Sequence, residues 1–334
     1  MKVLIIGGGG NIGFWVEKLF SENNHYVCSL SRGTYKTKRS HPDNQTNFSF
    51  IREDINALSE SSMRSITNYD VVIDFICYDA IDAQMRLKLF SKFSGLFVMV
   101  STVAVYDRSP GMNVLSAQSS CYNTQWGYAK RKLDAERVLL AGMPIGQLKI
   151  CRFGHTFDIS LPVPFGVGDW TIIQWLLDGN PLMLCKGSES SWPLLHSRDA
   201  ARRLLMMATE PRQFGTILNI VNWKVSSWFE IGETLFSTLR IPKAFRLLDV
   251  DDLKNTCPYW SESVVFHKQF DETYVGDEIE IFSDLKGDDW SLTTGLSVSL
   301  SFYFAEESFQ IVNQSDYLQY SLLAKKSRAF RDQN

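Results

Sequence analysis

Near the start of the chain lies a glycine-rich run, GGGGNIG at residues 7–13, which limits the possible folds more than any other feature. It follows a short apolar stretch, residues 2–6, and precedes residues 12–21, whose apolar positions recur at helical spacing. Glycines at such a junction let the backbone turn tightly and approach a pyrophosphate, whose charge the amides of the helix N-terminus then hold. The run therefore predicts a strand, a turn and a helix that bind a dinucleotide. The expected contacts are Gly7, Gly10, Asn11, Ile12 and Gly13.

Short apolar runs alternate with longer amphipathic stretches through the first 150 residues, which is the pattern of repeated βα units around a parallel sheet. Most of these runs are almost continuously apolar, as in strands that are buried on both faces. The fold class is therefore α/β: a Rossmann-type, doubly wound parallel sheet with a smaller mixed α+β part. We predict strands at 2–6, 26–31, 48–52, 71–76, 96–101, 147–152 and 216–221, and helices at 12–21, 83–93 and 126–141.

The pattern becomes mixed after the sixth predicted strand, and this change suggests a division of the chain. We expect residues 1–155 to form the dinucleotide-binding Rossmann domain, to which residues 196–222 return with one more helix and strand. Residues 156–195 and 223–334 are then expected to form a substrate-binding cap.

Composition and charge disfavour several classes of function. A net charge of -3 gives no electrostatic reason to expect a nucleic acid as partner. The six cysteines are scattered without a CxxC pair, which argues against a disulfide framework and against a metal site. No run reaches the ~18 apolar residues that a membrane span needs. We therefore expect a cytoplasmic protein with a small-molecule substrate, no nucleic acid and no membrane.

The end of the second predicted strand bears on which dinucleotide binds. An acid at this place hydrogen-bonds the ribose 2′-hydroxyl of NAD, whereas an arginine accommodates the 2′-phosphate of NADP. The chain reads Leu30-Ser31-Arg32-Gly33 here, with no acid. The guanidinium of Arg32 can make paired hydrogen bonds to a phosphate. We therefore expect NADP as the cofactor, with NAD as the alternative.

Three segments resemble the extended branch of the short-chain dehydrogenase/reductase superfamily, which contains NAD(P)-dependent epimerases and dehydratases. These are the glycine run with its Gly-Gly-x-Gly-x-Ile-Gly spacing, VSTVAVY at residues 100–106 and HSRDAA at residues 196–201. The resemblance implies that Asp54, after the third strand, contacts the adenine and that Thr102 takes the catalytic Ser/Thr position. It also implies a possible homodimer through the helices around 83–93 and 126–141.

The resemblance further implies a Tyr-x-x-x-Lys pair on one helix, in which the lysine lowers the pKa of the phenol and holds the ribose. In the segment WGYAKRK, residues 126–132, we assign this lysine to Lys130. The residue four positions earlier is Trp126, whose indole N–H cannot give up its proton near neutral pH. On this assignment Trp126 replaces the catalytic tyrosine. Tyr128 is expected to face away from Lys130, because two residues correspond to about 200° around a helix.

Other side chains are then candidates for the acid or base and for contacts with the substrate. Tyr78 follows the fourth predicted strand, and Tyr106 lies close in sequence to Thr102, so either phenol could exchange a proton. The candidates for substrate contacts are Trp126, His155 and His196. The sequence does not choose among these residues.

Two classes of function remain. The first is an NADP(H)-binding, epimerase/dehydratase-like oxidoreductase that acts on a sugar nucleotide or a secondary metabolite with a non-standard acid/base. The second is a non-redox protein that keeps NADP as a ligand, such as a regulator, a scaffold or an RNA-associated protein. We favour enzymatic activity because many polar residues are expected on the pocket side.

Overall fold

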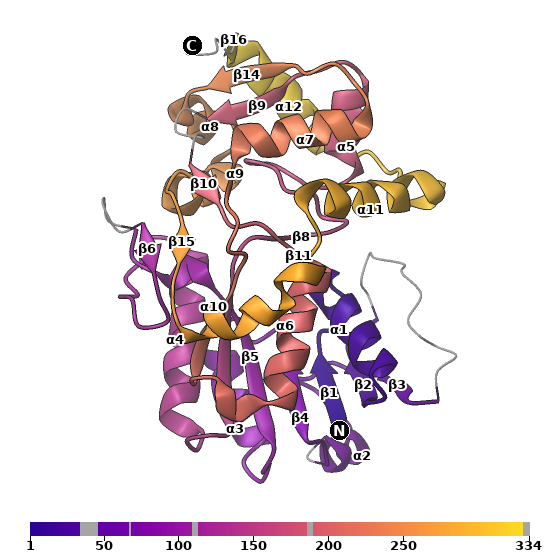
Figure 1. Ribbon diagram of the computed structural model, residues 1–334, viewed down its shortest axis with the longest axis vertical. Coiled ribbons are helices and arrows are strands. Elements are labelled where there is room, and N and C mark those ends of the chain that lie inside the picture. Colours follow the sequence, from indigo (N-terminus) through magenta and orange to yellow (C-terminus); the bar gives the residue numbers. More distant parts are fainter. Residues whose placement is uncertain (34–45, 67, 109–112, 186–189, 330–334) are drawn as a thin grey trace.

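A seven-stranded parallel sheet organises the first part of the molecule (Figure 1). The computed structural model describes residues 1–33, 46–66, 68–108, 113–185 and 190–329. The strands of the sheet have the spatial order β12-β7-β5-β4-β1-β2-β3, so the chain reverses direction across the sheet next to β1, as in a doubly wound fold. This confirms the predicted fold class. The strands are β1 (Lys2–Ile6), β2 (Tyr26–Leu30), β3 (Phe48–Ile51), β4 (Val71–Asp74), β5 (Leu96–Thr102), β7 (Leu148–Phe153) and β12 (Ile217–Ile220).

Helices cover both faces of this sheet. On one face α1 (Asn11–Glu22) packs against α6 (Ser197–Thr209), and on the other α3 (Ala80–Leu89) packs against α4 (Gly127–Gly142). The helix α2 (Glu60–Ser65) lies in the connection from β3 to β4. Alternate residues of β1 serve the two faces: Val3 and Ile5 belong to the core under α1 and α6, and Leu4 and Ile6 to the core under α3 and α4. Both faces are therefore buried, which explains the continuous apolar runs.

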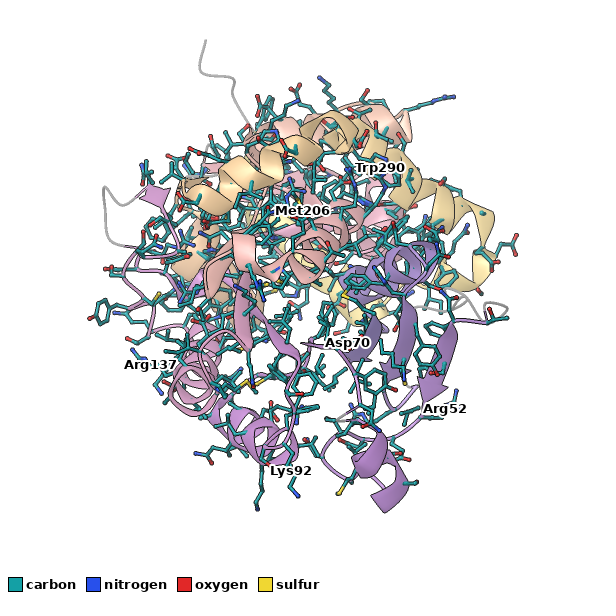
Figure 2. All side chains as sticks on the ribbon, turned by 60° about the horizontal axis from the view of Figure 1, so that its bottom comes forward. Arg52, Asp70, Lys92, Arg137, Met206 and Trp290 are labelled. Atoms are coloured by element: carbon teal, nitrogen blue, oxygen red, sulfur yellow. The ribbon has the colours of Figure 1, made fainter. Side chains whose placement is uncertain are left out.

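Side chains fill the two spaces between the sheet and its helices (Figure 2). In this view Arg137 and Lys92 mark the α3–α4 side of the molecule, and Arg52 marks the opposite edge beyond β3. Asp70 lies just before β4, where its carboxylate accepts a hydrogen bond from the backbone N–H of Lys2 at 2.7 Å. Such contacts fix the N-terminal ends of the strands and leave the carboxyl ends for ligands.

A second part of the chain forms a cap above the carboxyl ends of the strands (Figure 1). Its sheet has three strands in the order β16-β14-β9, and a large aromatic core joins this sheet to the helices of the cap. Trp192 and Trp228 are 0% and 1% exposed, so these indoles are core residues. The cap elements are β9 (Leu182–Cys185), β14 (Phe245–Leu248), β16 (Arg328–Ala329), α5 (Trp170–Leu177), α7 (Trp228–Leu239), α8 (Val250–Thr256), α9 (Pro258–Ser263), the π-helical turn η3 (Val264–Lys268), α11 (Leu292–Ala305), η5 (Glu307–Phe309) and α12 (Gln314–Lys326).

Short two-stranded ladders connect the sheet to the cap. The pairs are β8 (Thr156–Phe157) with β11 (Leu195–His196), β6 (Val114–Leu115) with β15 (Thr273–Tyr274), and β10 (Ser191–Trp192) with β13 (Ser226–Ser227). The remaining short helices are η1 (Val103–Val105), η2 (Pro211–Gln213), α10 (Asp277–Ile281) and η4 (Phe282–Asp288).

The segment formed by α10 and η4 corrects the expected domain division. It was assigned to the cap, but it packs on the Rossmann part. The ring of Phe282 lies 5.1 Å from that of Phe214, and Glu278 accepts hydrogen bonds from the backbone and side chain of Asn219 in β12. Phe282 is 1% exposed, so burial of this ring holds the segment against the Rossmann core.

In the described ranges, no helix is long and apolar enough to cross a membrane. The same residues contain no group of three or more His, Cys, Asp or Glu side chains that could hold a metal ion.

Candidate cofactor and active site

The glycine run forms the tight turn between β1 and α1. Gly7 has a φ of +79°, which disfavours any side chain, and a Cβ there would lie 2.5 Å from Cγ2 of Ile76. A Cβ on Gly13 would lie 2.1 Å from the carbonyl oxygen of Gly8, so the first turn of α1 can approach the loop this closely only with glycine. These two positions make a cradle that a side chain would fill.

The N-terminus of α1 is open to an anion. Its N-cap residue is Gly10, which has no side chain to bond the free N–H groups of the first turn, where Asn11 and Ile12 are the first residues. In most helices a Ser, Thr, Asp or Asn side chain satisfies these donors. A pyrophosphate would satisfy them here and would also interact favourably with the helix dipole. The residues at this turn therefore fit a dinucleotide.

A cleft of about 300 Å³ continues from the glycine turn across the ends of β2, β3 and β4. Arg32 and Asp54 lie on its rim, with 3.9 Å between Nη1 and Oδ2, and their side chains are 69% and 41% exposed. The backbone N–H of Asn56 donates to Oδ1 of Asp54 at 2.9 Å, which orients this carboxylate. The lining residues are Gly7, Gly9, Leu30, Ser31, Arg32, Gly33, Glu53, Asp54, Ile55, Asn56, Ile76, Tyr78, Asp82 and Arg86.

A buried ion pair supports the inner wall of this cleft. Nε of Arg86 donates to Oδ2 of Asp74 at 2.6 Å, and both side chains are almost fully buried. Nη1 of Arg86 also donates to Asn56 at 3.0 Å, while Asp74 accepts from the backbone of Ile76 at 2.8 Å. The pair thus ties α3 to the end of β4 and to the loop after β3. Sequence reasoning missed this pair because its two residues belong to different elements.

Thr102 is the last residue of β5 and caps η1. Its hydroxyl accepts from the backbone N–H of Ala104 at 3.2 Å, and the residue is 9% exposed. This places the hydroxyl at the carboxyl edge of the sheet, beside α4.

The structure corrects the assignment of the active-site lysine. The side chain of Lys130 is 57% exposed on the outer face of α4, where Nζ pairs with Asp134 at 2.9 Å. Lys132 instead is 3% exposed, and its Nζ donates to the carbonyl oxygens of Val100 at 2.9 Å and Cys77 at 3.0 Å. These carbonyls lie in β5 and just after β4, beside the candidate cofactor cleft.

Tyr128 is the residue four positions before Lys132, so the two lie on the same face of α4. Burial raises the pKa of the Tyr128 phenol, and a side-chain hydrogen bond with Thr102 offsets part of this rise. Tyr128, Thr102 and Lys132 therefore have the four-residue spacing and the hydroxyl contact of a proton-exchanging site. Trp126 is not in the tyrosine position but is the N-cap residue of α4.

The signal for this pair was present in the sequence. The segment YAKRK, residues 128–132, contains tyrosine and lysine at the required spacing, and counting back from Lys130 rather than Lys132 obscured it. What separates the two lysines is burial, because one faces the sheet and the other faces solvent. A periodic pattern with Ala129, Leu133 and Glu136 inside would have placed Lys132 on the buried side.

The two alternative phenols have different positions. Tyr106 is 0% exposed, its hydroxyl donates to Asn219 at 2.7 Å, and its ring lies 4.8 Å from the guanidinium carbon of Arg152. Burial also raises its pKa to about 12. A phenol enclosed and bonded in this way is a structural residue, so of the roles open to Tyr106 the proton-exchanging one is disfavoured. Tyr78 is 49% exposed and lines the cleft, with Nζ of Lys132 4.7 Å from its ring centre.

The two histidines that are expected near the substrate also lie in different surroundings. His196 is 1% exposed and packs against Phe157 and Trp290, with Nε2 3.6 Å from the buried carboxylate of Asp158. It is part of the connection between sheet and cap rather than of a substrate wall, which corrects that expectation. His155 follows β7 and is partly exposed beside the aromatic core of the cap.

The chain matches the model of the NAD dependent epimerase/dehydratase family over residues 3–220, and it belongs to this family. Among curated proteins it is similar to the 2'-dehydrokanamycin reductase of Streptomyces kanamyceticus, with 23% identity over 256 residues, which cover 72% of this chain and 68% of that protein.

Two crystal structures share the fold. The dTDP-glucose 4,6-dehydratase of Bacillus anthracis, in complex with NAD, has a TM-score of 0.69 and 16% identity, over 92% of this chain and 98% of that one. The UDP-glucuronic acid 4-epimerase of Bacillus cereus, also in complex with NAD, has a TM-score of 0.69 and 16% identity, over 91% and 100% of the two chains.

Proposed function

We propose that this protein is an oxidoreductase that transfers hydride between NADP and a carbonyl or alcohol carbon of a small molecule. The observation that carries the proposal is the grouping of Tyr128, Thr102 and Lys132 next to Tyr78, which lines the cleft that begins at the glycine turn. Bound in this cleft, the nicotinamide supplies or accepts the hydride. The N-terminus of α1 would hold the pyrophosphate, and the loop around Asp54 would hold the adenosine.

Tyr128 exchanges the proton. The phenol is protonated at neutral pH, so that Oη can donate its proton to a carbonyl oxygen as the substrate is reduced. Burial raises the pKa of this phenol and so opposes the transfer, and the hydrogen bond with Thr102 offsets part of that rise. The hydroxyl of Thr102 has one proton, which it can donate to the phenol oxygen or, once a substrate is bound, to the substrate oxygen instead. Lys132 is fixed by two carbonyl oxygens, and its cation stabilises the phenolate that proton transfer leaves.

NADP is favoured over NAD by the end of β2. Ser31 and Arg32 stand where an acid would bond the ribose 2′-hydroxyl, and Arg32 is paired only at 3.9 Å with Asp54. An exposed pair of this length contributes little, so the guanidinium is free to turn toward a 2′-phosphate. Fluorescence titration tests this: NADPH should bind more tightly than NADH, and Arg32→Ala should remove most of the difference. Equal affinities in the wild type would contradict the choice of NADP.

The reductase and the sugar-nucleotide enzymes among the similar proteins support a sugar-like substrate. The direct test follows NADPH oxidation with a panel of keto compounds that includes 2′-dehydrokanamycin and 4-keto sugar nucleotides. Oxidation that depends on one of these ketones supports the proposal. Absence of hydride transfer to the entire panel, in protein that binds NADPH, would count against it. A non-redox protein would need no tyrosine paired with the active-site lysine, so the pair of Tyr128 and Lys132 supports the enzymatic class instead.

We also propose a homodimer, because the resemblance to the family implies one. On α3, Ile81 is 68% and Met85 36% exposed, which is consistent with an interface through α3 and α4. Light scattering of the purified protein distinguishes a dimer from a monomer.

A further inference from the structure

The cap side of the proposed active site carries an aromatic surface. The indole of Trp126 is partly exposed, with its ring centre 5.3 Å from that of Tyr128 and 5.8 Å from that of His267 in the cap. The ring of His267 packs on the buried indole of Trp192, with 4.6 Å between the ring centres. Trp126 therefore lies between the proton-exchanging tyrosine and the cap, where a substrate bound to Tyr128 would meet it.

His155 adds an uncharged hydrogen-bonding group to this region. Its ring packs edge to face against Trp192 and Trp228, with ring-centre distances of 5.9 Å and 5.6 Å. Burial, with help from the nearby Lys268 and His267, lowers the pKa of His155 well below its ordinary value. The imidazole is therefore neutral at neutral pH and offers one donor and one acceptor.

The charged groups behind the aromatic surface neutralise one another. Nη2 of Arg108 lies 2.6 Å from Oε1 of Glu272, and Nε2 of His267 lies 2.7 Å from the same oxygen. Tyr274 donates to the other oxygen of Glu272 at 2.9 Å. The positive charge of Arg108 is thus compensated within the protein.

In the part of the cap that the structure describes, no pair of guanidinium groups lies at this place. A nucleotide sugar carries a diphosphate, which proteins commonly bind with the paired donors of arginine. The described cap ranges, 156–185, 190–195 and 223–329, contain three arginines, Arg240, Arg246 and Arg328. Arg246 and Arg328 lie in β14 and β16, at the end of the cap remote from the parallel sheet (Figure 1), and are bonded to Ser327 and Asp249. Arg240 is the exposed residue that ends α7.

One lysine of the cap, Lys268, lies nearer to the aromatic surface than these arginines do. Nζ of Lys268 donates to the carbonyl oxygen of Val163 at 2.9 Å and lies 5.0 Å from the ring centre of Trp228. Burial lowers the pKa of this amine to about 7, which weakens its positive charge near neutral pH. A single amine that already bonds a carbonyl oxygen and lies over an indole is a weak partner for a diphosphate.

We propose that the substrate is a carbohydrate ring without a phosphate group, which lies against the indole of Trp126 and hydrogen-bonds to neutral groups such as His155. The apolar C–H face of a pyranose suits an exposed indole, and its hydroxyls suit an uncharged imidazole. This inference rests on the proposed function, because it takes Tyr128 as the reacting end of the cleft.

The experiment measures binding separately from turnover. Saturation-transfer NMR and calorimetry in the presence of NADPH compare four probes: uridine diphosphate, UDP-glucose, methyl α-glucoside and kanamycin. We expect at least one phosphate-free glycoside to bind and uridine diphosphate not to bind. Trp126→Ala should weaken glycoside binding about tenfold, and Trp126→Phe should stay within about threefold of wild type. The affinity for NADPH, measured in each variant, should not change and reports that the fold is intact.

Binding of uridine diphosphate, or of UDP-glucose in preference to both glycosides, would overturn the inference. So would the absence of binding by both glycosides, or glycoside binding that is equal in wild type and Trp126→Ala. Failure of the proposed function looks different: glycosides would bind through Trp126, but no member of the ketone panel would oxidise NADPH.

Discussion

At the scale of single residues, burial decides which lysine can serve the site. Lys130 and Lys132 are two positions apart on α4, yet one side chain is 57% exposed and the other residue is 3% exposed. The sequence analysis predicted an active-site lysine on this helix but placed it two residues too early, and it therefore predicted no tyrosine partner for it. Only Lys132 has a tyrosine four positions before it, so spacing and residue type together favour the buried lysine.

Substitution of each lysine in turn tests whether Lys130 or Lys132 is the active-site lysine. Lys132→Ala removes the cation beside Tyr128 and should lower kcat/KM for NADPH-dependent reduction about 100-fold or more. Lys130→Ala removes only an exposed pair with Asp134, so both activity and stability should stay close to wild type. Steady-state kinetics of both variants check this. A large loss in Lys130→Ala, with Lys132→Ala unaffected, would restore the original assignment.

Neutral histidines in the folded protein should make stability depend on pH. The pKa of His155 and of His267 is lowered, chiefly by burial, so the unfolded chain binds these protons at a higher pH than the folded chain does. The stabilisation is present above the unfolded value of about 6.5 and is lost as pH falls below it, with a slope of up to about 1.4 kcal/mol per pH unit per histidine. Denaturant unfolding between pH 7 and pH 5 measures the slope. His155→Gln should reduce it, and an unchanged slope would show that His155 titrates normally.

At the scale of elements, long apolar runs were predicted well and short ladders were not. All seven strands of the parallel sheet lie within one or two residues of their predicted positions, because burial on both faces leaves a strong pattern. The ladders between sheet and cap, such as β8 with β11, have two residues per strand, too few for any periodicity. Helix α3 begins at Ala80, earlier than predicted, because Asp79 caps it by accepting from Ile81 and Asp82.

The glycine turn is the element whose geometry is most demanding. Gly13→Ala places a Cβ 2.1 Å from the carbonyl oxygen of Gly8, which must move the loop that holds the pyrophosphate. The affinity for NADPH should fall at least about tenfold, a loss of about 1.4 kcal/mol. Gly287→Ala is the matched control, since a Cβ there meets nothing within 4 Å. Fluorescence titration compares the two, and tight binding by Gly13→Ala would show that the turn is not the pyrophosphate site.

At the scale of the whole molecule, the chain joins its two parts through ion pairs that sequence could not reveal. Asp289, just before α11, pairs with Arg203 of α6 at 2.7 Å, and their side chains are 7% and 0% exposed. Asp199 accepts from the backbone N–H of Trp290 at 2.9 Å, next to this pair. The partners are about ninety positions apart, so no local pattern connects them. The same reason explains why α10 and η4 were assigned to the cap.

Two neighbouring aspartates test this connection. Asp289→Ala leaves the buried guanidinium of Arg203 without its carboxylate and should destabilise the protein by about 3 kcal/mol. Asp288→Ala removes a carboxylate that is 75% exposed and bonded to Arg202, and should cost less than about 1 kcal/mol. Chemical denaturation of both variants gives the comparison. Equal effects would mean that the pair with Arg203 contributes little to stability.

The central claim is that Tyr128, and not another phenol, exchanges the proton in this molecule. The most direct measurement is single-turnover oxidation of bound NADPH by a ketone that the wild type reduces, in Tyr128→Phe and in Tyr106→Phe. Tyr128→Phe should bind NADPH normally and lose at least about 100-fold in the rate of hydride transfer. Tyr106→Phe should keep a far larger share of the rate, because its hydroxyl is bonded to Asn219 inside the core. A wild-type rate in Tyr128→Phe would contradict the claim.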